Sequence, residues 1–109
     1  MENSKDLYGG NSMNDEELVC DYDPREISQN FVIKNAKKLP NKNKILKFLS
    51  SGKAFAYTTE RAVDILENEE ISDFDLLYSN GKWYWSKSIE YNFKKYDIPL
   101  KEEFVNSIK

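Results

Sequence analysis

Two groups of neighbouring carboxylates are the residues of this sequence best suited to chemistry. Glu67, Glu69 and Glu70 form one group, and Asp73 and Asp75 form the other. Paired carboxylates can bind Mg²⁺ or act as general acid and base. The groups lack the ligand spacing of a calcium-binding EF-hand, and no phosphate-binding loop accompanies them. We therefore expect these carboxylates to have neither a metal-binding nor a catalytic role.

The composition removes several other classes of active site. The chain has 109 residues and no histidine, so it lacks the commonest general base and the commonest transition-metal ligand. A single cysteine, Cys20, excludes an intramolecular disulfide and a thiolate zinc site. The four glycines are too scattered for a phosphate loop. Carboxylate, lysine or tyrosine chemistry stays open in principle, but the sequence favours a non-enzymatic protein without a cofactor.

The charges are arranged in blocks of one sign. Residues 27–59 contain seven lysines and no acid, whereas residues 60–81 contain seven acids and only one base, Arg61. Such blocks either steer charged partners or form solvated faces that neutralise one another across the folded surface. The lysines of residues 34–53 could hold nucleic-acid phosphates. An isoelectric point near 5.0 and the scarcity of arginine disfavour that interpretation.

The acid-rich stretch from residue 60 to residue 75 is the feature that we expect to carry function. Carboxylates on a small acidic protein can occupy the basic surface with which an enzyme would otherwise hold nucleic acid. In the segment Trp83-Tyr84-Trp85, alternation predicts that both tryptophans face the core and that Tyr84 faces outward, although an exposed aromatic anchor is the alternative. The predicted partner-binding residues are Glu60, Asp64, Glu67, Glu69, Glu70, Asp73, Asp75 and Tyr84.

Local patterns predict the elements that position these residues. Asn41 followed by an apolar stripe predicts a helix at 41–51 that ends at Gly52. Strands are expected near 30–34 and at 54–59, and residues 59–71 are ambiguous between a helical turn and an irregular connector. Asn80-Gly81 predicts a type I′ hairpin between 74–78 and 82–85. Further helices are expected from Ser86 to just before Pro99 and at 101–108.

This order of elements predicts an α+β fold, with a small antiparallel sheet and a central β-hairpin packed against two or three helices. The length indicates one domain at 16–109, preceded by a disordered tail at 1–15. No apolar run is long enough to span a bilayer, and the first residues lack the pattern of a signal peptide. We therefore expect a cytoplasmic protein that does not contact membranes.

Two segments of the sequence have a recognisable layout: LPNKNKILKFLSSGKAFAYTT (39–59) and LLYSNGKWYWSKSIEYNFKKYDIPLKEEFVNSI (76–108). In this layout the chain resembles small uncharacterised and immunity-type bacterial proteins. The matching positions are Asn80 and Gly81 at the turn, the aromatic Trp85, and a terminal element containing Pro99, Leu100 and Phe104. These are packing and turn positions, so the resemblance implies a fold and carries over no catalytic residue.

The leading hypothesis is a protein-binding module, most concretely an immunity or inhibitor protein that blocks a toxin or another enzyme through an acidic surface. The alternative is a small nucleic-acid-associated regulator that uses the lysine-rich face of residues 34–53. The sequence leaves the partner's identity and the oligomeric state open.

Overall fold

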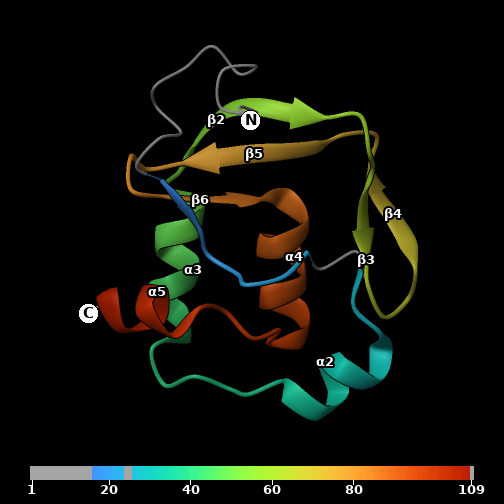
Figure 1. Ribbon diagram of the computed structural model, residues 1–109, viewed down its shortest axis with the longest axis horizontal. Coiled ribbons are helices and arrows are strands. Elements are labelled where there is room, and N and C mark those ends of the chain that lie inside the picture. The colour runs from blue at the N-terminus through green and yellow to red at the C-terminus, as the bar shows by residue number, and fades with distance from the viewer. Residues whose placement is uncertain (1–15, 24–25, 109) are drawn as a thin grey trace, which may run out of the picture.

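The computed structural model describes residues 16–23 and 26–108, which contain ten helices and strands (Figure 1). The predicted disordered tail at 1–15 lies outside these residues. In chain order the elements are β1 (Glu17–Leu18), α2 (Gln29–Asn35), α3 (Lys42–Ser50), β2 (Lys53–Thr58), β3 (Ala62–Asp64), β4 (Glu69–Ser72), β5 (Asp75–Ser79), β6 (Trp83–Ser86), α4 (Lys87–Tyr96) and α5 (Glu102–Ser107).

Four strands form one mixed sheet in the order β1-β6-β5-β2. The pairs β2–β5 and β5–β6 are antiparallel, and the short β1 pairs parallel with β6. Strands β3 and β4 form a separate two-stranded hairpin beside the end of this sheet (Figure 1). Helices α3, α4 and α5 lie on the β6 side of the molecule, away from β2 (Figure 1). This arrangement confirms the predicted α+β class.

The core is built around the tryptophans of β6. Trp85 is fully buried and Trp83 nearly so, as the alternation in this strand predicts. The Phe48 ring centroid of α3 lies 5.6 Å from that of Trp85 and 5.4 Å from that of Phe104. Phe104 of α5 also contacts Trp83, at 5.2 Å between centroids. These aromatic contacts join three elements that are far apart in sequence.

The hairpin between β5 and β6 forms where it was predicted, but its turn is not type I′. A type I′ turn needs positive φ at both central residues. Gly81 has a φ of 101°, whereas Asn80 is not among the described residues with positive φ. Asn80 instead accepts hydrogen bonds at Oδ1 from the amides of Lys82 (3.1 Å) and Trp83 (2.9 Å). The side chain of Asn80 therefore closes the turn.

The predicted strand near 30–34 is wrong, because these residues belong to helix α2. Ser28 caps this helix by accepting a hydrogen bond from the amide of Phe31. Only Val32 of the apolar run is buried, and Ile33 is 69 % exposed. Three consecutive apolar residues resemble a buried strand in the sequence. In the helix only one of them faces the core, and the others face solvent.

The segment that the sequence left ambiguous is resolved as the β3–β4 hairpin. Residues 65–68 form its turn, and Asn68 takes a positive φ of 58° there. Helices α3, α4 and α5 occupy the predicted ranges. Helix α4 ends at Tyr96, and its C-cap residue Asp97 takes the left-handed conformation two residues before Pro99. In the described part of the chain, no helix meets the length and hydropathy that a membrane span requires.

Candidate functional site

The acidic residues predicted to bind a partner divide into an exposed and a buried group. Five of them are exposed and lie on the β3–β4 hairpin or directly beside it, and we call these five residues the acidic surface: Glu60, Glu67, Glu69, Glu70 and Asp73. Glu70 forms an ion pair with Arg61 across the hairpin. The structure therefore gathers most of the predicted acids on one supersecondary unit.

Asp64 belongs to the buried group, so its assignment to a partner-binding surface is wrong. It ends strand β3 and is only 1 % exposed. Its Oδ1 accepts hydrogen bonds from the amides of Leu66 (3.1 Å) and Glu67 (2.8 Å), which stabilises the hairpin turn. This carboxylate cannot meet a partner because its own chain surrounds it.

Three side chains from α4 complete the environment of Asp64. Its Oδ2 accepts hydrogen bonds from the hydroxyl of Tyr91 (2.9 Å) and from Nζ of Lys95 (3.0 Å). The Tyr96 hydroxyl lies 2.6 Å from Oδ1 and 2.8 Å from Oδ2. Both oxygens of Asp64 are thus occupied by donors, and the cluster attaches the hairpin to α4.

The ionisation of this cluster follows from the same contacts. Burial alone would raise the pKa of Asp64, but hydrogen bonds from Tyr96, the Glu67 amide, Lys95 and Tyr91 outweigh it and lower that pKa far below its usual range. Burial, followed by the hydrogen bond to Asp64, raises the pKa of Tyr96 to about 12. Hydrogen bonds to Asp64 and Tyr91 raise the pKa of Lys95. At neutral pH the cluster therefore contains an ionised carboxylate and a charged ammonium.

Asp75 is also buried, which corrects its assignment to the surface. Its Oδ1 accepts a hydrogen bond from the amide of Ser88, at 2.9 Å, in the first turn of α4. An anionic side chain is favourable there because the first amides of a helix lack partners within the helix. Asp75 therefore joins β5 to the beginning of α4.

A buried amide makes a second link between α4 and the hairpin. Asn92 accepts a hydrogen bond at Oδ1 from the amide of Ile65 (3.0 Å), and its Nδ2 donates to the carbonyl oxygens of Val63 (2.9 Å) and Ser88 (2.7 Å). Every polar atom of the Asn92 side chain thus has a partner. Asn92 and the Asp64 cluster together hold the acidic hairpin in one orientation on α4.

Tyr84 does not join the acidic surface. It is half-buried on β6, a central strand of the four-stranded sheet, where it is paired in register with Leu18 and Ser79. The acidic surface belongs to the other sheet and its flanks. Tyr84 faces away from the tryptophans as predicted, but the structure does not bring it to the predicted site.

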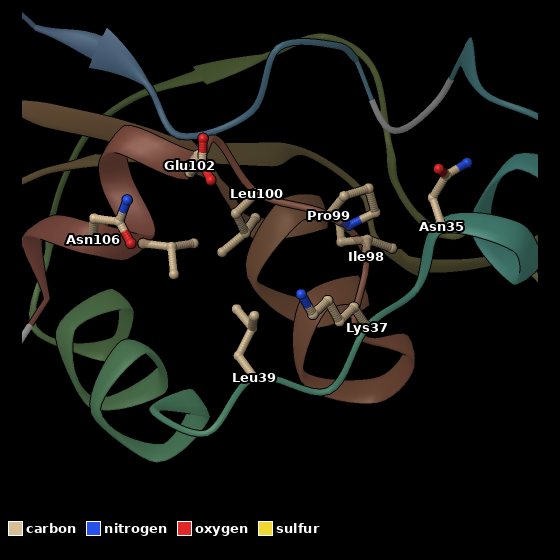
Figure 2. Close-up of a pocket in the computed structure, with 9 residues that line it drawn as sticks. Asn35, Lys37, Leu39, Ile98, Pro99, Leu100, Glu102 and Asn106 are labelled. Atoms are coloured by element: carbon tan, nitrogen blue, oxygen red, sulfur yellow. The ribbon is translucent and has the colours of Figure 1, made fainter.

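A groove lies between the segment that joins α2 to α3 and the segment that joins α4 to α5 (Figure 2). Its volume is about 280 Å³, and Leu39 and Leu100 point toward one another across it. Asn35, Lys37, Glu102 and Asn106 provide the polar side chains of its lining. The volume lies just below the range of about 300–1,000 Å³ typical of small-molecule sites. We assign no ligand to this groove.

The lysine-rich segment remains largely on the surface. Of its seven lysines, Lys42 is half-buried and forms an ion pair with Asp97 at 2.7 Å. The other six are exposed, and within the described part of the chain none of them has an ion pair: Lys34, Lys37, Lys38, Lys44, Lys47 and Lys53.

Within residues 16–23 and 26–108, no group of three or more potential ligand side chains could hold a metal ion. No family model, curated protein or solved structure matches the chain.

Sequence reasoning missed the partners of Asp64. Tyr91 and Lys95 lie four residues apart, which places them on one face of a helix, and Tyr96 follows directly. That spacing predicts polar side chains gathered on one face of α4. Its acceptor lies 27–32 residues earlier in the chain, and no local pattern indicates a contact over that separation.

Proposed function

We propose that this chain is a non-enzymatic, cytoplasmic bacterial protein-binding domain that acts as an immunity or inhibitor protein by occupying a basic surface of a toxin or other enzyme. The observation that carries the proposal is the exposure of five carboxylates on and beside a single hairpin that the Asp64 cluster and Asn92 attach to α4.

Attachment to α4 matters for the strength of binding. A charged loop that is ordered only on binding loses conformational entropy, which weakens the complex. In this protein the hairpin is already held by the hydrogen bonds of Asp64 to Tyr91, Lys95 and Tyr96. Its carboxylates therefore present a preformed negative field, which increases the association rate with a basic partner and selects against acidic ones.

The test is a pull-down from the native host with a charge-reversal variant. Glu67→Lys/Glu69→Lys reverses two exposed charges with no ion pair in the described part of the chain, and Lys44→Glu/Lys47→Glu on α3 is the matched control. We expect one stoichiometric protein partner that the hairpin variant loses and the α3 variant retains. Recovery of no partner, or equal recovery by both variants, would contradict the proposal.

A nucleic-acid-associated regulator is the second candidate, and the six exposed lysines without a described ion pair favour it. That function requires phosphate contacts, so binding to DNA or RNA would weaken steeply as salt increases. In the same pull-down, recovery of nucleic acid that Lys44→Glu/Lys47→Glu abolishes would replace the first candidate with the second.

A further inference from the structure

Two aromatic rings are exposed beside the acidic surface and contact each other. Tyr57 of β2 is 64 % exposed, and Phe74, directly before β5, is 49 % exposed. Their ring centroids lie 5.0 Å apart, with an angle of 56° between the ring planes. Two adjacent exposed rings offer apolar area that a partner can bury.

Acidic residues flank this pair in the chain, and a backbone hydrogen bond holds one of them beside it. Asp73 immediately precedes Phe74, and Glu60 follows Tyr57 by three residues. The Glu60 carbonyl oxygen accepts a hydrogen bond from the amide of Asp75 at 3.0 Å, which holds residue 60 beside the segment that contains Phe74. The aromatic pair is therefore continuous with the acidic surface.

We propose that the Tyr57–Phe74 pair receives an arginine side chain of the basic protein partner. A guanidinium group stacks on an aromatic face and also pairs with carboxylates, so it matches both components of this site. Lysine is a weaker match because its strongly hydrated ammonium stacks less readily on a ring. The inference rests on the proposed function and specifies the centre of its interface, with the acidic surface as the charged rim.

Charge disfavours two other occupants, even though Arg61, whose guanidinium interacts electrostatically with Asp73, offsets part of the negative charge here. In a two-fold dimer formed through this pair, the carboxylates of Glu60 and Asp73 would approach the same acids of the second copy. Phosphates of a nucleic acid would meet the same repulsion. Aromatic rings beside a carboxylate already hold a cation within the chain, since Lys95 Nζ lies 5.5 Å and 5.4 Å from the ring centroids of Tyr91 and Tyr96 beside the Asp64 carboxylate. This cation is a lysine, so the arrangement supports the charge of the occupant and not the choice of arginine.

The experiment uses two heptapeptides of equal charge, acetyl-GRGRGRG-amide and acetyl-GKGKGKG-amide, titrated into the full chain at low salt. Binding is followed by NMR through the amide and ring signals of Tyr57 and Phe74. The variants Tyr57→Leu and Phe74→Leu keep an apolar side chain and remove the ring. Phe55→Leu makes the same change at another exposed ring of β2 and is the matched control.

We expect the arginine peptide to shift the signals of Tyr57 and Phe74 and to bind more tightly than the lysine peptide. The difference should be at most about two- to fivefold, the factor that one whole exposed cation–π contact provides. Tyr57→Leu or Phe74→Leu should remove this preference, and Phe55→Leu should keep it. Equal affinities for the two peptides, shifts centred elsewhere, or a preference that survives both variants would overturn the inference.

The outcome separates this inference from the proposed function. If Glu67→Lys/Glu69→Lys loses the partner from the host whereas Tyr57→Leu retains it with unchanged affinity, the acidic surface binds without an arginine contact, and only the inference fails. If the chain sediments as a dimer that Tyr57→Leu dissociates, the aromatic pair is a self-contact, and the inference fails for that reason.

Discussion

Replacing Asp64 with asparagine is expected to destabilise the domain strongly without changing the exposed carboxylates. The substituted side chain could retain an acceptor for the amides of Leu66 and Glu67, but its NH₂ group would face the Tyr91 hydroxyl and the Lys95 ammonium. A hydrogen bond to a charged group contributes about 1.5–3 kcal/mol, and breaking a buried ion pair costs about 3–5 kcal/mol. Lys95 is 46 % exposed and can regain water, which reduces the cost. We expect Asp64→Asn to lower the free energy of unfolding by about 2–4 kcal/mol.

Urea unfolding at neutral pH, followed by the fluorescence of the buried tryptophans, measures this loss. For a domain of this size it corresponds to a fall in Tm of roughly 10–25 °C. Glu69→Gln is the control because Glu69 is exposed and pairs in register with Asp64, and it should change stability by less than about 0.5 kcal/mol. A loss below about 1 kcal/mol for Asp64→Asn would refute the view that this cluster attaches the hairpin to α4.

The same cluster predicts how stability depends on pH. The pKa of Asp64 is lower in the folded chain than in the unfolded chain. Asp64 therefore contributes its full stabilisation above its unfolded pKa of about 4. This stabilisation is lost as the pH falls toward the folded pKa. The stability of the wild type should decline more steeply below about pH 4 than that of Asp64→Asn. Parallel curves would contradict this assignment.

Three further predictions test the packing of the core. Gly52→Ala should cost about 1–3 kcal/mol in urea unfolding, because a Cβ at residue 52 would lie 2.3 Å from Cζ2 of the buried Trp85. Ser86→Ala should cost about 1 kcal/mol in the same assay, because Ser86 Oγ caps α4 by accepting a hydrogen bond from the Ile89 amide at 3.2 Å. Burial raises the pKa of Cys20 to about 12, so Ellman's reagent should label the native thiol slowly at about pH 8 and rapidly in urea. Unchanged stability in either variant, or rapid labelling of the native thiol, would contradict the corresponding contact.

The parts of the fold that the sequence predicted are those governed by local chemistry. The apolar stripe of α3 and the cap at Ser86 depend on residues within one or two turns. The strand predicted at 30–34 failed because the consecutive apolar residues Phe31, Val32 and Ile33 resemble a buried strand, and the prediction did not consider Ser28, which caps the helix in the structure. Strand β1 was missed because two residues carry no periodicity, and its partner β6 lies some 66 positions later.

The sequence predicted only part of the candidate site, and the reason is related. Sequence showed where the acids are, but burial depends on whether a carboxylate meets donors from distant residues. Asp64 and Asp75 meet such donors in α4, whereas Glu67 and Glu69 are exposed. The alternation along β6 was sufficient to orient Tyr84, yet it could not show that this residue and the acids lie on different sheets.

The position of the first described segment has a consequence for how the chain folds during synthesis. β1 pairs with Trp83 and Tyr84, the Val19 carbonyl oxygen accepts a hydrogen bond from the Lys101 amide at 2.7 Å, and the Tyr22 hydroxyl donates to the Pro99 carbonyl at 2.6 Å. Residues of this segment thus pair with partners that the ribosome makes some 66–82 positions later. This edge of the sheet cannot close until those partners have left the ribosome, so it forms late in the folding of the domain.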